Sequence, residues 1–389
     1  MERPEEFKEI AHSGGRVIIN VTTDEHGRRL YRQTWQHERA VPAGIFAIYA
    51  IASHGIPVCQ VPLGGIGSPI PRPPVPGCVM VFIGSDSEGL YGQQCPTCNG
   101  YWRNKLGHVC PYCAQRGQIQ DFLTPAQRSY VAQYCLRVTE IVDKCEDGDH
   151  IIDMDAVADA AGKDIEKPPF YYAEESQQHK FTCQACDEMT DILGTYGYCS
   201  SCGTRNDLQE LTEKVIPAIR DRINAGGPYE ACVRDSVAAF DSLAGRYVEQ
   251  LITVVAMTPG RRERLGRIRF HNLAGTATEL KQVFDIDILS GMSDEDRAFA
   301  ELMFHRRHVY EHRGGEADEK YIEDSGDKSV RVKQALRETQ ESAHRIASLV
   351  QKVSKNLHAG FHEIVPVEQA PIDRHQKHLE RAAVFKKGR

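Results

Sequence analysis

The sequence has no long apolar run and no excess of positive charge. Its longest apolar segment, 41–52, is well short of the roughly 20 residues that a helix needs to cross a bilayer, so we expect no membrane span. The formal net charge of −7 argues against a protein that coats nucleic acid through bulk charge. No secretory signal is recognisable, and we therefore expect a cytoplasmic protein with reduced thiols. At 389 residues, the chain has room for about two or three domains.

Most of the cysteines occur in closely spaced pairs. Cys95-x-x-Cys98 is followed by Cys110-x-x-Cys113, and Cys183-x-x-Cys186 is followed by Cys199-x-x-Cys202. Two such pairs joined by a short hairpin bring four thiolates within tetrahedral reach of one Zn²⁺. We predict two zinc ions per chain, both structural, because four Cys ligands leave no coordination position for a catalytic water. The cysteines outside these pairs show no pairing pattern and are Cys59, Cys78, Cys135, Cys145 and Cys232.

The N-terminal part alternates in the manner of β-strands. Residues 16–23 and 29–36 flank a turn and predict a hairpin, and residues 79–83 and 89–92 predict a second one that leads into the first CxxC pair. In the apolar run 41–52, the residues after Pro42 are mostly apolar, and Gly55 follows the run. A proline in the first turn and a glycine after the end favour a buried helix.

Helical periodicity dominates the middle of the chain. Apolar spacing predicts helices over 125–146 and 154–161, and Lys167-Pro168-Pro169 then breaks the chain before a strand-like segment at 170–172. After the second set of cysteines, residues 207–223 predict a further helix. The break near residue 168 is the best boundary between the two halves of the chain.

The segment 306–315 carries the clearest catalytic signal. Arg307 and His312 lie late on a helix that we expect to begin near Asp294, after the N-cap Ser293. An arginine can neutralise a phosphate, and a histidine can move a proton near neutral pH. An i, i+5 pair lies roughly 140° apart around an ideal helix, so the two side chains do not share one face. They can meet only if Arg307 reaches around the helix or a second subunit contributes to the same cleft.

Residues of about 226–360 resemble a HEPN domain, whose signature is an Arg, a polar residue, a short spacer and a His. Arg307, His308 and His312 match that signature in order, and the segment 314–321 resembles the glycine turn and Asp-x-x-Tyr continuation of one branch of the family. The framing segments that also fit are a first helix at 229–252, the stretch 270–288 and a closing helix at 329–357.

This resemblance implies a metal-independent endoribonuclease that acts on RNA as a homodimer. By resemblance, His312 would be general base or acid, Arg307 would stabilise the transition-state charge, and His308 would orient the phosphate. The family further implies a toxin or antiviral defence effector. The expected fold of the whole chain is multidomain α+β, with a mixed β/α N-terminal region that carries a zinc ribbon, a second zinc ribbon and, by resemblance, a C-terminal all-α, HEPN-like bundle. The expected divisions are 1–120 with the ribbon 95–113, a helical connector 121–168, the second ribbon 169–206, the helical domain 207–360 and a basic tail 361–389, in which we expect residues 374–389 to be disordered.

Three other readings remain open at the level of sequence. The helical domain can be a non-catalytic scaffold that only dimerises or binds nucleotide. The ribbons can serve a nucleic-acid adaptor whose main contact is the arginine-rich segment 261–269. His305, His308 and His312 share one helical face and can hold a metal ion.

Overall fold

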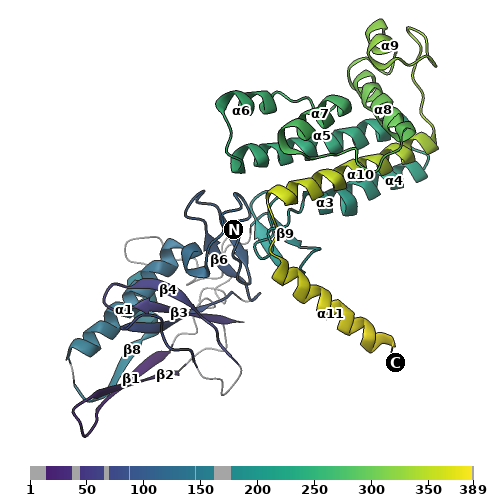
Figure 1. Ribbon diagram of the computed structural model, residues 1–389. Helices are drawn as coiled ribbons and strands as arrows, with labels where there is room; N and C mark the ends of the chain where they lie inside the picture. Colours follow the sequence, from purple (N-terminus) through teal and green to yellow (C-terminus); the bar gives the residue numbers. More distant parts are fainter. Residues whose placement is uncertain are drawn as a thin grey trace. The chain divides into compact units, whose positions relative to one another are not determined.

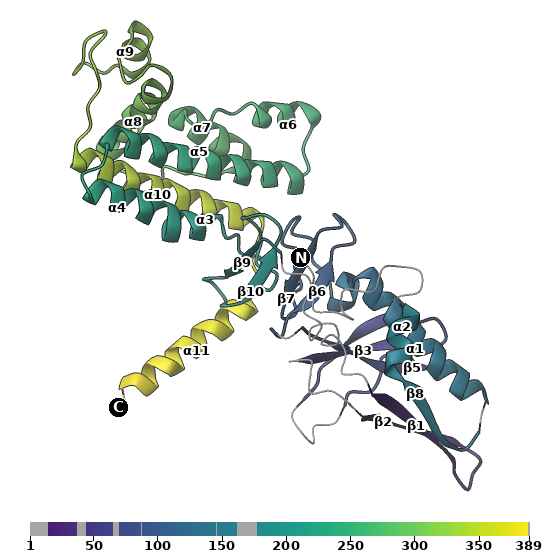
Figure 2. The same cartoon turned by 180° about the vertical axis from the view of Figure 1, so that it is seen from behind.

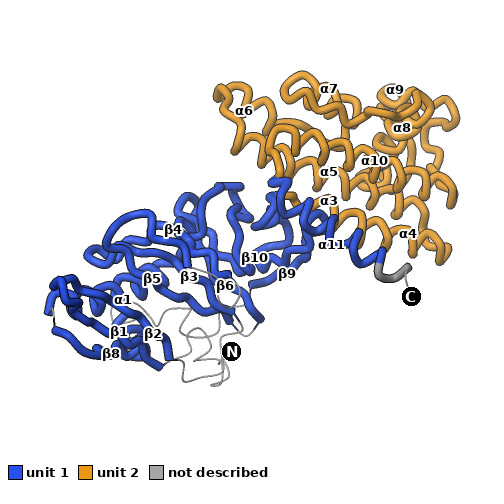
Figure 3. The backbone as a smooth tube through the Cα atoms, turned by 60° about the horizontal axis from the view of Figure 1, so that its bottom comes forward, with its two compact units in different colours: residues 1–203, 368–389 blue, residues 204–367 orange. Residues whose placement is uncertain are grey.

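The computed structural model describes residues 15–36, 44–64, 70–86, 88–144, 146–161 and 177–387. The chain forms two compact units, shown in Figure 3: unit 1 spans residues 1–203 with 368–389, and unit 2 spans residues 204–367. The described strands belong to unit 1, and the described elements of unit 2 are helical (Figure 1). The chain is thus mixed α+β, with N-terminal sheets and C-terminal helices. The strand expected at 170–172 and Cys145 lie outside the described residues.

The first sheet of unit 1 contains the predicted N-terminal hairpin. Strand β1 (Arg16–Thr23) pairs antiparallel with β2 (Arg29–Gln36) on one side and with β8 (Gly148–Asp153) on the other. Along β1 the side chains of Val17, Ile19 and Val21 are buried, while their neighbours are more exposed. This alternation buries one face of the sheet and confirms the hairpin.

The second sheet corrects the expected helix at 41–52, because residues Ile45–Ile51 form strand β3. β3 is the central strand, between β4 (Ile56–Val61) and β5 (Cys78–Gly84). Phe46, Ile48 and Ala50 face the main core, while Ala47 and Tyr49 belong to an apolar cluster on the other face. A strand covered on both faces is continuously apolar, so its pattern cannot be told from that of a short buried helix.

The second predicted hairpin is also wrong. β5 pairs with β3, whereas β6 (Tyr91–Gln94) pairs with β7 (Tyr101–Asn104), so the segment between β5 and β6 connects two different sheets. β7 also pairs with β10 (Met189–Ile192), which in turn pairs with β9 (His179–Thr182). The two cysteine-rich segments, far apart in sequence, thereby share one sheet.

Two helices pack against the two N-terminal sheets of unit 1 (Figure 2), and their predicted positions are confirmed. A 3₁₀ turn (Ile119–Phe122) leads into α1 (Pro125–Lys144), which contacts α2 (Met154–Ala161) and strands of both N-terminal sheets. Tyr130, Tyr134 and Cys135 of α1 lie in the same core as β1 and β3. The expected pieces 1–120 and 121–168 therefore lie within one compact unit, together with the third piece as far as residue 203.

The basic C-terminal tail is helical, which corrects the expectation of disorder. Residues Gln369–Lys387 form α11. Its sequence is rich in Ala, Gln, Lys and Arg, which are strong helix formers. The residue before it, Glu368, pairs with Arg116 and donates its backbone N–H to the Cys202 carbonyl at 2.7 Å. These contacts attach the start of the tail to unit 1.

Unit 2 is built on two long helices, α5 (Tyr229–Val254) and α10 (Gln340–Ile364), which pack along each other. Their buried apolar faces include Phe240 and Tyr247 of α5 and Val350 and Phe361 of α10. The remaining helical elements are α3 (Asp207–Glu210), a π-helical turn (Leu211–Val215), α4 (Ile216–Asn224), α6 (Pro259–Gly266), α7 (Leu273–Phe284), α8 (Asp294–His312) and α9 (Glu319–Ser325).

The helices expected at 207–223 and 229–252, and the helix from Asp294, agree with these bounds, but the closing helix begins later than expected. The side chain of Thr339 caps α10 and accepts a hydrogen bond from the Ser342 N–H at 3.1 Å. Residues 329–338 instead form an irregular segment. A capping residue fixes a helix start that the apolar spacing alone does not mark.

Candidate functional site

The eight paired cysteines form two clusters in unit 1. Among the described residues, they make up the groups of three or more possible ligands whose donor atoms come together, and within each group these atoms lie within 4.8 Å of one another. The cysteines are free, not disulfide-bonded. The first group is Cys95, Cys98, Cys110 and Cys113, and the second is Cys183, Cys186, Cys199 and Cys202.

The same backbone turn holds each CxxC pair. The residue after the second cysteine has a positive φ in all four pairs: 57° at Asn99, 59° at Ala114, 62° at Asp187 and 78° at Gly203. Its N–H donates to the carbonyl of the first cysteine of the pair at 2.8–3.1 Å. Four repeats of this turn point pairs of sulfur atoms at two common centres. The donor sets fit two tetrahedral ions, in agreement with zinc in a structural role.

The two ribbons are joined through buried polar contacts. Asn104 on β7 donates its amide to the Ser200 hydroxyl at 2.7 Å, and the backbone N–H of Val109 donates to the Ser200 carbonyl at 3.0 Å. Arg103 on β7 pairs with Asp191 on β10 at 2.8 Å and also contacts Asp86. Since the three charged side chains are almost fully buried, removing one would leave a partner uncompensated. The ribbons therefore form one structural element.

The HEPN-like motif lies on the last turns of α8, as expected. The Ser293 hydroxyl caps this helix by accepting from the Asp296 N–H at 3.1 Å. At the other end, Gly314 and Gly315 have φ values of 62° and 87°, and the Gly315 N–H donates to the Val309 carbonyl at 3.2 Å. This left-handed glycine turn ends the helix directly after His312.

The three predicted catalytic residues point in two directions. Arg307 turns toward α5, where its Nη2 lies 3.7 Å from Asp241 and 2.8 Å from Glu311, and its side chain is only 12% exposed. His308 and His312 are exposed instead, with their ring centroids 4.8 Å apart. The structure therefore brings the two histidines together and ties the arginine to two carboxylates.

A cavity of about 270 Å³ opens beside His308. His271 and Asn272, just before α7, form one part of its wall, and His305 and His308 of α8 form another. Cationic side chains around the cavity are Arg269, Arg313 and Lys320, and the acidic ones are Asp318 and Asp324. The cavity thus combines three imidazoles with groups that can attract a phosphate.

Partial desolvation by the surrounding side chains lowers the pKa of both His271 and His308. For His271, Asp241 opposes this shift, while Arg307 and Arg269 add to it. For His308, the neighbouring His312 and His271 lower the pKa further. Both imidazoles are consequently neutral near pH 7 and able to accept a proton.

His271 is a candidate functional residue that we did not single out from the sequence. It lies in the segment 270–288, which fits the family frame, but its approach to His308 depends on the packing of α7 against α8. By contrast, the alternative metal site at His305, His308 and His312 is not among the donor groups that come together in the described part of the chain.

Arg306, which directly precedes Arg307, belongs to a network of ion pairs and hydrogen bonds inside unit 2. Its guanidinium pairs with Asp327 and Glu338, each at 3.0 Å, and its Nε donates to the Tyr321 hydroxyl at 3.3 Å. Tyr310 donates its hydroxyl to Glu338 as well. This buried network fixes the irregular segment after α9 onto α8.

Comparisons with protein-family models, with curated proteins and with solved structures give no match. The likeness to HEPN domains therefore rests on the motif residues and their helical frame. In the described residues, no helix is both long and apolar enough to span a bilayer.

Proposed function

We propose that unit 2 is a metal-independent endoribonuclease of HEPN type and that the two cysteine clusters hold structural zinc. One observation carries the proposal. His271 and His308 line a single cavity with Arg269, and His312 is in ring contact with His308. Paired imidazoles beside a cationic surface supply proton transfer and phosphate attraction, which are the requirements of RNA cleavage without a metal.

The proposed reaction is attack of an RNA 2′ oxygen on the adjacent phosphorus atom. His308 accepts the proton of the 2′-hydroxyl, because its lowered pKa keeps it neutral at pH 7. His312 donates a proton to the 5′ oxygen as the bond between that oxygen and phosphorus breaks. The products are a 2′,3′-cyclic phosphate and a 5′-hydroxyl end.

Arg307 stabilises the charge that develops on the phosphate. Its guanidinium faces Glu311, which is 39% exposed, and a phosphate oxygen can take the place of that carboxylate. We also propose a symmetric homodimer through α8, as the family resemblance implies. His308 and His312 lie on an exposed part of this helix, where a second copy can complete the cleft. The same resemblance suggests a toxin or antiviral defence effector, and we propose a cytoplasmic location because the paired cysteines require reduced thiols.

One contact favours a second candidate, a non-catalytic scaffold. Arg307 already has two carboxylate partners, Asp241 and Glu311, within its own chain. If these ion pairs persist when RNA is present, the guanidinium does not reach a phosphate. Unit 2 would then only dimerise or bind nucleic acid.

RNA cleavage in the presence of a chelator distinguishes the two candidates. The full chain is incubated with a mixture of cellular RNAs, with and without EDTA, and the ends of the fragments are identified. We expect brief EDTA treatment to leave cleavage intact and the fragments to carry 2′,3′-cyclic phosphate. Binding of RNA with no cleavage under either condition would support the scaffold.

A further inference from the structure

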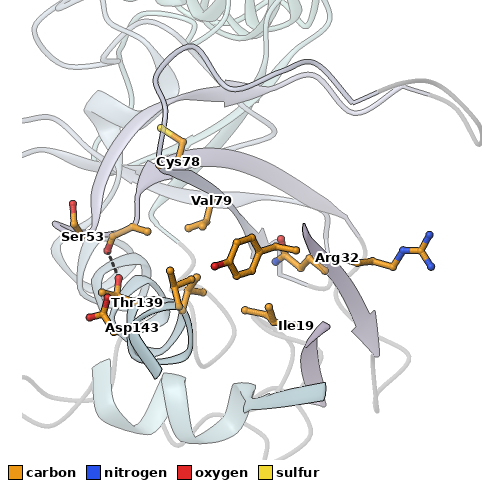
Figure 4. Close-up of a pocket in the computed structure, with 13 residues that line it drawn as sticks. Ile19, Arg32, Ser53, Cys78, Val79, Thr139 and Asp143 are labelled. Atoms are coloured by element: carbon orange, nitrogen blue, oxygen red, sulfur yellow. Dashed lines mark hydrogen bonds between the residues drawn. The ribbon is translucent and has the colours of Figure 1, made fainter. Parts of the chain in front are cut away.

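A larger cavity, of about 510 Å³, lies within unit 1 and is separate from the residues of the proposed active site. Figure 4 shows it between strands β1 and β2, the start of β5 and the second half of α1. A volume of this size is typical of a site for a small organic molecule, for which about 300–1,000 Å³ is usual.

The walls of this cavity are largely apolar. Ile19 of β1, Val79 of β5 and Val138 and Val142 of α1 surround it, and Tyr31 of β2 supplies an aromatic ring. Figure 4 shows Val79 and Ile19 on opposite sides of the cavity. Such a lining favours a compact apolar or aromatic body, because its burial removes apolar surface from water.

Two neutral polar side chains of the lining, Gln33 and Thr139, offer acceptors. Gln33 uses its amide nitrogen to donate to the Tyr134 hydroxyl and, at 3.4 Å, to the Met80 carbonyl, which leaves its amide oxygen as the remaining group. Thr139 uses its hydroxyl proton on the Ala52 carbonyl at 3.0 Å.

Two charged side chains, Arg32 and Asp143, also line the cavity. The guanidinium of Arg32 points away from the cavity in Figure 4. Asp143, at the end of α1 that lines the cavity, has no ion-pair partner among the described side chains. The cavity therefore presents a carboxylate and neutral acceptors next to an apolar slot.

We propose that this cavity binds a small organic amine. The apolar or aromatic body of the ligand lies between Tyr31 and the valines, and its ammonium group faces Asp143 and the Thr139 oxygen. A charged donor matches the Asp143 carboxylate and the Thr139 oxygen, and a charge-assisted hydrogen bond is stronger than a neutral one. This site is independent of the proposed ribonuclease activity, since no residue of unit 2 takes part.

Three probes with the same phenyl ring test the chemical class. Phenethylamine, 2-phenylethanol and 3-phenylpropanoate present a cation, a neutral hydroxyl and an anion, and each is titrated calorimetrically into the full chain. We expect phenethylamine to bind with a Kd of about 0.1–1 mM, as is usual for a ligand of this size. The alcohol should bind about tenfold more weakly or worse, and the carboxylate should not bind measurably.

Substitutions locate the binding. Asp143→Asn should weaken phenethylamine binding about tenfold and leave the alcohol unaffected, because it removes the charge and keeps the shape. Glu140→Gln is the matched control on the same helix, since Glu140 pairs with Arg137 on the exposed side at 3.1 Å. Val142→Phe should fill the slot and abolish binding of both ligands, with circular dichroism to confirm that the variant is folded.

Each of three results would overturn the proposal. The first is equal binding of the amine and the carboxylate. The second is amine binding that Asp143→Asn and Glu140→Gln alter to the same degree. The third is the absence of heat with phenethylamine at concentrations well above the expected Kd. RNA cleavage by the Asp143→Asn variant should match that of the parent, so failure of this site and failure of the ribonuclease are separate outcomes.

Discussion

Replacing Arg306 with leucine should destabilise unit 2, whereas the same change at the adjacent Arg307 should have little effect. Arg306 lies between Asp327 and Glu338, whose side chains are only 4% and 1% exposed. Removal of one partner from a buried ion pair costs about 3–5 kcal/mol, because the remaining charge stays buried. The partners of Arg307 are 28% and 39% exposed, so water screens that loss to about 0–1 kcal/mol.

The pKa of Asp327 gives a second measure of how much its contacts stabilise unit 2. Hydrogen bonds from Ser329, Tyr321 and Arg306 outweigh its burial and lower this pKa from 3.8 to about 2. The difference corresponds to about 2 kcal/mol of stability. This stability is fully present above pH 4 and is lost as the pH falls toward 2. The difference in the free energy of unfolding between the parent and Arg306→Leu should therefore become smaller as the pH falls from 4 toward 2.

Urea unfolding followed by circular dichroism measures the change in unit 2. Trp35 and Trp102, the two tryptophans of the chain, belong to unit 1, so their fluorescence serves as an internal control. Arg306→Leu should lower the urea concentration at the midpoint of the unit 2 transition. The midpoint of the fluorescence transition should stay unchanged. Equal destabilisation by Arg306→Leu and Arg307→Leu would refute this account of the two arginines.

Two further predictions concern metal content and assembly. Elemental analysis should find about two Zn²⁺ per chain, and Cys186→Ser should also weaken zinc retention at the first cluster, because Asn104 and Ser200 join the two ribbons. A folded, metal-free chain would contradict the zinc assignment. Light scattering should show a dimer at micromolar concentration, and a strict monomer would argue against a cleft shared by two subunits.

The cysteine groups of the two ribbons could be predicted from the sequence. The pairing of the two ribbons in one sheet could not. The CxxC spacing identifies the ligand groups because metal geometry restricts the intervening chain. In contrast, the pairing of Thr190 with Asn104 joins strands that are distant in sequence, and no local pattern marks such a contact. The same limit explains β3, whose apolar run is equally compatible with a helix until the covering of both its faces is known.

In the candidate site, too, positions along one helix could be predicted from the sequence, whereas contacts between helices could not. Helix periodicity and capping place Arg307, His308 and His312 at the end of α8, in agreement with the structure. The direction of the Arg307 side chain depends on Asp241 of α5, and the approach of His271 depends on the packing of α7. These contacts are tertiary, so the spacing of residues within α8 carries no information about them.

The rate of RNA cleavage by matched histidine variants tests the proposed ribonuclease most directly. His344 is the control, because it lies on α10, where its Nε2 is 3.0 Å from the Asn224 side-chain oxygen, and it does not line the cavity. We predict that His308→Ala and His312→Ala each reduce the rate about 10²- to 10⁴-fold, while His344→Ala cleaves as the parent does. Parental rates in all three variants, or no cleavage by the parent itself, would contradict the central claim.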